Sequence, residues 1–333
     1  MSANFSQKFK EAVLQVTGAD GFGKVELIQT LWSGYGQILK VELTGCEVGS
    51  VILKNIQPPE EIRHPRGWNS QRSQERKLRS YQVEAHWYHS WSQRCDESCR
   101  VPKLYKVLQR EEGSLLILED LDEAGFPLRK ERLSSNELKS CLKWLAEFHA
   151  TFLQEEPTGL WETGTYWHFE TRPDEFSALP EGSLKEAASI IDKRLSNARF
   201  QTFVHGDAKV ANFCFSSTMN QVAAVDFQYV GRGCGVRDIA YFLGSCLSEN
   251  ELTEKAQVSF EDYLELLAVS IRWRRPRIDA DAVVSEWRDL FDWAWADFER
   301  FLQGWSPGHR KLGGFSSDIT SKVVKEVLES RGR

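Results

Sequence analysis

The stretch FVHGDAKVANFCF, residues 203–215, decides how this sequence is interpreted. Two apolar runs flank a polar segment that contains His205, Asp207, Lys209 and Asn212. Such a segment is either a turn whose polar side chains cap the neighbouring strands, or a reaction centre held between them. The residues that follow it favour a reaction centre.

A second apolar run, VAAV, follows the first and ends at Asp226. It can pair with NFCF across the turn SSTMNQ to form a hairpin. That hairpin brings Asn212 and Asp226 to the same end, where two oxygen ligands can share one Mg²⁺. We therefore predict Asn212 and Asp226 as metal ligands, with the carboxylate of Asp207 close to the metal.

Composition limits the class of protein. A chain of 333 residues, 41% of them hydrophobic, can bury a substantial core and is expected to form two lobes. The formal net charge of -6 argues against a nucleic-acid binder, because phosphate backbones are bound mainly by excess Lys and Arg. No apolar run is long enough for a membrane span, and the first residues lack the apolar core of a signal peptide. We expect a cytoplasmic protein whose seven cysteines, without paired metal-type spacing, are reduced thiols.

The first part of the chain is predicted to be an antiparallel sheet of five strands with one long helix. Alternating or continuous apolar positions mark the strands at 25–32, 37–43, 50–56, 103–109 and 114–121. The helix is predicted over 75–91. The glycine-containing turn SGYG, residues 33–36, joins the first two strands as a hairpin.

The segment GADGFGK, residues 18–24, resembles a phosphate-binding loop. However, Val25 stands where such a loop supplies a Ser or Thr hydroxyl to Mg²⁺. The residues after Lys24 also alternate as a strand does, whereas a phosphate-binding loop opens a helix. We interpret this segment as a loop before the first strand.

The second part is predicted to be mainly helical, which makes the fold class α+β. Ser134 is a candidate N-cap for an apolar-striped helix over 134–153, and another helix is expected over 183–197. Aromatic-rich helices follow toward the C-terminus. The boundary falls within EDLDEAG, residues 119–125, so we expect an N-lobe of residues 1–120 and a C-lobe of residues 121–333.

The spacing of these polar residues suits phosphoryl transfer. Asp207-x-x-x-x-Asn212 and the later Asp226-Phe match the catalytic-loop and metal-binding motifs of the protein-kinase superfamily. Gly206 stands where protein kinases have Arg, and His-Gly-Asp followed by VDFQ instead resembles the small-molecule branch. That branch contains aminoglycoside phosphotransferases, choline and ethanolamine kinases and, most similar, the ecdysteroid-kinase-like group. The resemblance implies a bilobal protein-kinase-like fold that transfers the γ-phosphate of ATP, with Mg²⁺, to a small-molecule hydroxyl.

The resemblance also implies a role for each polar residue of the loop. Asp207 would orient and deprotonate the acceptor hydroxyl, and Asn212 and Asp226 would hold Mg²⁺. Lys209 would contact the transferred phosphate, although a solvated loop lysine is the alternative. Asp238, in the later GVRDIAYF, corresponds to the aspartate that braces the catalytic loop. His205, at the end of a buried strand, is interpreted as a framework residue and not as a base.

The nucleotide-binding residues are expected in the first part of the chain. Lys54 ends VILK, as the phosphate-pairing lysine of kinases does, and Glu84 or Glu75 of the following helix would be its ion-pair partner. Glu84 is preferred because it lies in the apolar, inward-facing part of that helix. The backbone of Ser33, Gly34, Tyr35 and Gly36 would cover the phosphates, and the backbone of Glu119, Asp120 and Leu121 would contact adenine.

The acceptor stays open, with choline-like amines, aminoglycosides and steroid alcohols all allowed by the resemblance. The aromatic rings of the second half could bind a quaternary ammonium group, and the irregular segment 157–176 could form one wall of the acceptor pocket. A catalytically silent nucleotide-binding scaffold of the same fold is the alternative function. Protein kinase activity is disfavoured, because VDFQ is followed too soon by GVRDIAYF to leave room for a peptide-docking segment.

Overall fold

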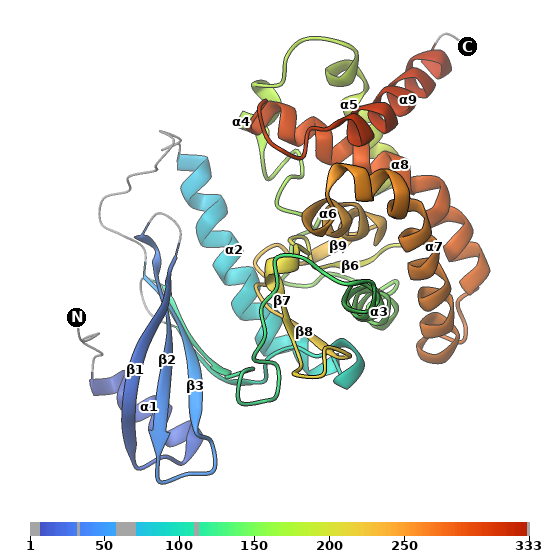
Figure 1. Ribbon diagram of the computed structural model, residues 1–333. Coiled ribbons are helices and arrows are strands. Elements are labelled where there is room, and N and C mark those ends of the chain that lie inside the picture. The colour runs from blue at the N-terminus through green and yellow to red at the C-terminus, as the bar shows by residue number, and fades with distance from the viewer. Residues whose placement is uncertain (1–6, 32–33, 58–70, 110–112, 332–333) are drawn as a thin grey trace.

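The computed structural model of the chain describes residues 7–31, 34–57, 71–109 and 113–331. Figure 1 shows a sheet built from the first part of the chain and a larger helical part built from the second, with α2 between them. The predicted fold class, α+β with an N-terminal antiparallel sheet and a mainly helical C-terminal part, is confirmed.

The N-terminal sheet has five antiparallel strands in the order β1-β2-β3-β5-β4. Its strands and helices are α1 (Gln7–Thr17), β1 (Gly21–Thr30), β2 (Gly36–Thr44), β3 (Ser50–Ile56), α2 (Gln71–Ser90), β4 (Leu104–Gln109) and β5 (Ser114–Glu119). Strand β3 is central, and alternate side chains point to opposite faces. Val51 and Leu53 join the core that includes Val13 of α1, whereas Ile56 joins the core that includes Tyr81 of α2. Lys54 therefore faces α2.

Strand β1 begins earlier than the sequence predicts. Gly21–Lys24, interpreted above as a loop, belong to β1, and Gly21 lies opposite Thr44 of β2. The pairing shifts register between Phe22 and Val25, an irregularity that glycine-containing segments accommodate easily. Because a strand and not a helix continues from Lys24, this segment cannot act as a phosphate-binding loop.

The C-terminal part is helical around two short two-stranded sheets. Its helices are α3 (Ser135–Thr151), α4 (Pro173–Ser177), α5 (Ser183–Ser196), α6 (Val236–Cys246), α7 (Glu249–Arg274), α8 (Ala280–Trp305) and α9 (Gly314–Arg331). Its strands are β6 (Thr202–Val204), β7 (Phe213–Phe215), β8 (Val222–Ala224) and β9 (Gly231–Gly233), paired as β6-β9 and β7-β8. Ser134 caps α3 through a reciprocal capping box with Glu137, as its position predicts.

Aromatic packing joins α2 to the C-terminal part. The ring of Trp87 on α2 stacks on Phe227, with centroids 4.6 Å apart and planes inclined by 18°. Both side chains are fully buried. This contact fixes α2 against the segment that follows Asp226, so residues from the two parts of the chain meet at one place.

Two further sequence predictions can be compared with the structure. All seven cysteines are free thiols. Among the helices that the structure describes, none has the length and apolar character needed to cross a membrane.

Candidate active site

The loop after β6 is held by one buried carboxylate. Asp238, in the first turn of α6, accepts hydrogen bonds from the backbone N–H of His205 at 2.5 Å and of Gly206 at 3.0 Å. Gly206 has φ +77°, and a Cβ there would lie 2.2 Å from the carbonyl oxygen of Tyr229. Only glycine fits this position, because a side chain would be strained and would clash with backbone. The glycine of His-Gly-Asp therefore has a local structural cause.

His205 connects this loop to the following hairpin. Its side chain is fully buried, with Nε2 3.0 Å from the carbonyl oxygen of Val225 and Nδ1 3.3 Å from the backbone nitrogen of Asp207. Donation from Nε2 and acceptance at Nδ1 are satisfied together by the neutral imidazole. These contacts fit the framework role expected for His205.

The carboxylate of Asp207 is held by three side-chain donors. Its Oδ2 lies 2.9 Å from Nζ of Lys209 and 3.2 Å from Nδ2 of Asn212, and its Oδ1 accepts from the hydroxyl of Tyr241 at 3.0 Å. Tyr241 lies on α6, one turn after Asp238. The same short helix thus orients both the loop backbone and the carboxylate that the loop presents.

The hairpin β7-β8 brings Asn212 and Asp226 together. Phe213 pairs with Ala224, and the N–H of Val225 donates to the carbonyl oxygen of Asn212 at 3.0 Å, so the two predicted ligands lie at the same end. Asp226 has φ +71°, a conformation that is costly for a residue with a side chain. Such strain is concentrated at functional sites, where the surrounding structure maintains it.

The oxygen atoms at this end suit Mg²⁺. The amide nitrogen of Asn212 donates to Asp207. The amide oxygen of Asn212, Oδ1, has no donor among the described residues. Oδ1 of Asp226 accepts from Lys54, at 3.1 Å, and from the amide of Gln228, which leaves Oδ2. No group of three or more His, Cys, Asp and Glu side chains forms a metal site within the described residues. One carboxylate and one amide oxygen nevertheless match Mg²⁺, which takes few protein ligands and completes its shell with phosphates and water.

Lys54 forms a buried ion pair with Glu84. Its Nζ lies 2.7 Å from Oε2 of Glu84 and 3.1 Å from Oδ1 of Asp226. Burial alone would lower the pKa of Lys54, but the two carboxylates raise it, so the ammonium stays charged. Burial would likewise raise the pKa of Asp226, but the charges of Lys54, Lys209 and Lys77 lower it. The partner of Lys54 is thus Glu84, the preferred of the two candidates.

A family model matches the region that contains this network. Residues 70–158 and 163–272 match the Ecdysteroid kinase-like family, and these ranges amount to more than half of the chain. This chain belongs to the ecdysteroid kinase-like family. No curated protein matches the sequence.

Several solved structures of small-molecule kinases are similar to this chain. A microcompartment-associated aminopropanol kinase is 15% identical, with a TM-score of 0.50 over 98% of this chain and 99% of that chain. The choline kinase of Streptococcus pneumoniae is 13% identical, with a TM-score of 0.45 over 97% and 100%. An aminoglycoside phosphotransferase of Streptomyces rimosus, in complex with ADP and streptomycin, is 14% identical, with a TM-score of 0.46 over 86% and 99%. At 15% identity, the likeness to the aminopropanol kinase concerns the fold alone.

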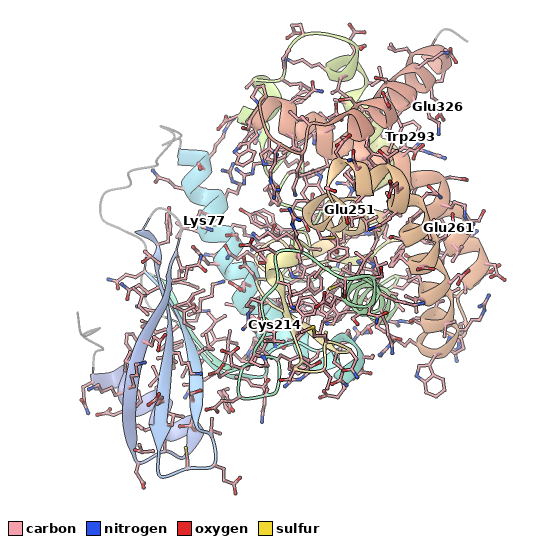
Figure 2. All side chains as sticks on the ribbon, in the orientation of Figure 1. Lys77, Cys214, Glu251, Glu261, Trp293 and Glu326 are labelled. Carbon is pink, nitrogen blue, oxygen red and sulfur yellow. The ribbon has the colours of Figure 1, made fainter. Side chains whose placement is uncertain are left out.

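In this member of the ecdysteroid kinase-like family, a second lysine lies near Asp226. Nζ of Lys77 donates to Oε1 of Gln228 at 2.9 Å and lies 4.6 Å from the ring centroid of Tyr81. Burial lowers the pKa of Lys77 to about 8, although the charge of Asp226 opposes that shift. Figure 2 labels Lys77 on α2. Sequence reasoning missed this residue, yet Lys77 precedes Glu84 by two helical turns and so shares its face.

The turn predicted to cover the phosphates is described only in part. Ser33 lies outside the described residues. Gly34 and Gly36 have φ +77° and +129°, and a Cβ on Gly36 would lie 1.9 Å from the carbonyl oxygen of Asn55. The ring of Tyr35 is buried against Tyr81, with centroids 5.9 Å apart. Tyr35 therefore anchors the described part of the turn to α2, where Gly34, Tyr35 and Gly36 have only backbone groups to offer a nucleotide.

The predicted adenine-binding segment has structural side chains. Glu119 forms an ion pair with Arg100, and Asp120 accepts from Lys40 and from Ser50, each at 2.6 Å. The carbonyl oxygens of Asp120 and Leu121 accept bonds from the turn that follows. These contacts fix the connection between the two parts of the chain, and the backbone N–H of Leu121 is one group there without an acceptor among the described residues.

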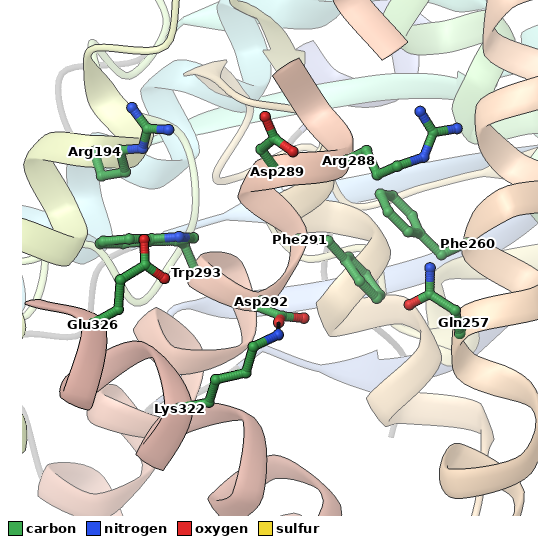
Figure 3. Close-up of a pocket in the computed structure, with 10 residues that line it drawn as sticks. All are labelled: Arg194, Gln257, Phe260, Arg288, Asp289, Phe291, Asp292, Trp293, Lys322 and Glu326. Atoms are coloured by element: carbon green, nitrogen blue, oxygen red, sulfur yellow. Dashed lines mark hydrogen bonds and ion pairs between the residues drawn. The ribbon is translucent and has the colours of Figure 1, made fainter. Parts of the chain in front are cut away.

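A cavity of about 460 Å³ lies elsewhere, among α5, α7, α8 and α9 (Figure 3). Trp293 and Phe291 contribute to it, together with the ion pair of Lys322 and Asp292. It shares no residue with the network around Asp207 and Asp226. We therefore assign the candidate active site to that network and not to the cavity.

Proposed function

We propose that this member of the ecdysteroid kinase-like family is an ATP-dependent phosphotransferase that moves the γ-phosphate to a hydroxyl of a small molecule. One observation carries the proposal: Asn212 is hydrogen-bonded to Asp207 and Lys54 to Asp226, and the β7-β8 hairpin brings the two pairs to the same end. Phosphoryl transfer is catalysed mainly by positioning and charge neutralisation, and it needs these groups close together. The nucleotide binds between an N-lobe of residues 1–120 and a C-lobe of residues 121–333.

On this proposal the acceptor hydroxyl donates its proton to Asp207. The carboxylate is held by Tyr241 and Lys209, which fix its direction. Lys209 also lies where the transferred phosphate arrives, and it can pair with that phosphate once the carboxylate has taken the proton. Mg²⁺, held by Asn212 and Asp226, supplies charge neutralisation for the phosphates when it is bound.

The remaining residues hold the nucleotide. Lys54, braced by Glu84, pairs with the α- and β-phosphates. The turn that contains Ser33, Gly34, Tyr35 and Gly36 covers the phosphates with its backbone. The backbone of Glu119, Asp120 and Leu121 meets adenine, with the N–H of Leu121 as donor.

The test is ATP consumption by the purified chain across a library of small alcohols, together with calorimetric binding of Mg²⁺-ATP. The proposal expects Mg²⁺-dependent binding and turnover with at least one alcohol. Tight Mg²⁺-ATP binding without turnover on any alcohol would instead indicate a catalytically silent scaffold.

Two matched variants test the metal assignment. Asp226→Asn should lose the Mg²⁺ dependence of ATP binding, because it removes the charged ligand. Asp289→Asn makes the same change at an exposed position of α8 and should bind ATP as the wild type does. Equal Mg²⁺ dependence in both variants would contradict the assignment of Asp226.

A further inference from the structure

Lys209 contacts Oδ2 of Asp207, and a second lysine, Lys311, lies on the Oδ1 side of the same carboxylate, behind Tyr241. Lys311 follows α8, and its Nζ lies 4.5 Å from the ring centroid of Tyr241 and 5.4 Å from that of Phe298. The hydroxyl of Tyr241 donates to Oδ1 of Asp207. One aromatic ring therefore separates the ammonium of Lys311 from the carboxylate proposed to accept the proton. Lys311 thus lies on the Tyr241 side of the carboxylate that would receive the acceptor hydroxyl.

No carboxylate pairs with the ammonium of Lys311 in the described part of the chain. In the described part of the chain no ion pair forms at its Nζ, whereas Lys54 and Lys209 each contact an aspartate directly. Burial lowers the pKa of Lys311 to about 8, and Asp207 is the carboxylate that most opposes this shift. Asp207 is already held by other donors. A partly buried ammonium without a counter-charge is costly, which indicates a position that a ligand can complete.

The aromatic rings near Asp207 already face cations of the protein. One buried cluster contains the rings of Tyr241, Phe298 and Phe301, and the ring of Tyr166 packs against it. Lys311 lies over Tyr241 and Phe298, and the guanidinium of Arg172 lies 5.7 Å from the centroid of Tyr166 and 5.8 Å from that of Phe301. A quaternary ammonium group would have to displace these cations to use the same rings.

The nearby carboxylates are also engaged. Glu175 pairs with Arg172 at 2.9 Å, and Asp297 pairs with Arg300 at 2.9 Å. Both acids lie on elements that border the aromatic cluster, α4 and α8. Neither is available to a cationic acceptor without breaking an ion pair inside the protein. Of these charged groups, the ammonium of Lys311 alone has no ion pair among the described residues.

We propose that Lys311 selects the acceptor by charge: it binds an anionic group, a carboxylate or a phosphate, on the same molecule as the acceptor hydroxyl, and it excludes cationic alcohols. This inference rests on the proposed function, because it takes Asp207 as the group that receives the hydroxyl. Lys311 is a specificity-determining residue on this proposal, and Asp207 remains the base.

The test uses three aromatic alcohols of similar shape and different charge. They are benzoate, benzamide and benzylamine, each with a hydroxyethyl group on the ring carbon para to the carboxylate, amide or aminomethyl group. Binding is measured by calorimetry with a non-hydrolysable ATP analogue and Mg²⁺ present, and transfer is measured separately with ATP. The wild type should bind the acid at least about tenfold more tightly than the amine, equivalent to about 1.4 kcal/mol. The neutral amide should fall between them.

Variants of Lys311 should change this order. Lys311→Met should abolish the preference for the acid, and Lys311→Glu should reverse it, with the KM for ATP unchanged in both. Lys325→Glu makes the same charge change at an exposed position of α9 and should keep the wild-type order. Circular dichroism and the Tm of each variant check that the fold is retained.

The outcomes separate this inference from the proposed function. Transfer to these alcohols with no charge preference, a preference for the amine, or a preference for the acid that persists in Lys311→Glu would overturn the inference and leave the proposed function standing. Charge-selective binding that depends on Lys311, without transfer, would support the inference and count against the proposed function. Failure of all three alcohols to bind would overturn the inference.

Discussion

The two aspartates of the site have different electrostatic surroundings. Around Asp226, the two positive charges of Lys54 and Lys77 are balanced by the two negative charges of Glu84 and Asp226. Asp207 contacts Lys209, and Lys311 lies nearby without a carboxylate partner in the described structure. On the proposed function, the charges of the nucleotide side are balanced within the fold, whereas the acceptor side keeps a positive charge that a ligand can match.

The largest expected effect on stability is on the balanced side. Lys54→Met leaves the buried Glu84 and the partly exposed Asp226 without their shared cation, and breaking a buried pair such as Lys54–Glu84 costs about 3–5 kcal/mol. The free energy of unfolding in urea measures this loss. Lys255→Met removes an exposed lysine that pairs with Glu251 and should change stability by less than about 1 kcal/mol. Equal losses in the two variants would show that the network is not a structural unit.

A smaller effect is expected on the acceptor side. Tyr241→Phe removes the hydroxyl that donates to Asp207, and a hydrogen bond to a charged group contributes about 1.5–3 kcal/mol. The rate of phosphate transfer should therefore fall about 10- to 100-fold, with little change in ATP affinity. Steady-state kinetics with separate KM values for ATP and the alcohol make this measurement. A change confined to the KM for ATP would indicate that Tyr241 acts on nucleotide binding and would contradict its proposed role at Asp207.

Measured per pH unit, the smallest effect is a slope in the pH dependence of stability. The pKa of Lys77 is about 8 in the folded chain and near 10.5 when unfolded, so between these values the unfolded state binds more protons. The free energy of unfolding should therefore rise with pH in this window, by up to about 1 kcal/mol per pH unit from this residue. Urea unfolding of the wild type and of Lys77→Met, from pH 7 to pH 11, should show a flatter curve for the variant. Parallel curves would mean that Lys77 is not desolvated.

Sequence reasoning was most informative where the determinants are local. The spacing from Asp207 to Asn212 and the short hairpin to Asp226 fix their proximity almost without tertiary information. The apolar face of the helix over 75–91 was sufficient to prefer Glu84 over Glu75. Strand periodicity likewise predicted the five-stranded sheet.

Other features depend on tertiary structure, and no pattern in the sequence predicts them. Strand β9 is Gly-Arg-Gly, which has no apolar alternation and forms a strand only because β6 lies beside it. Tyr241 stands in a segment that the sequence identified, but the direction of its hydroxyl depends on how α6 packs. Lys311 is far from Asp207 in the chain, and the path of the connection between α8 and α9 brings it near. The start of β1 at Gly21 was missed because its glycines favour a loop.

The most direct test of the proposed chemistry compares phosphate transfer by the wild type and by Asp207→Asn on one identified alcohol. Asparagine keeps the shape of the side chain and removes its capacity to accept the hydroxyl proton. The proposed role of Asp207 predicts a fall in kcat of about 10²- to 10⁴-fold, with the fold and the Kd for Mg²⁺-ATP retained. Transfer at the wild-type rate by Asp207→Asn would contradict it.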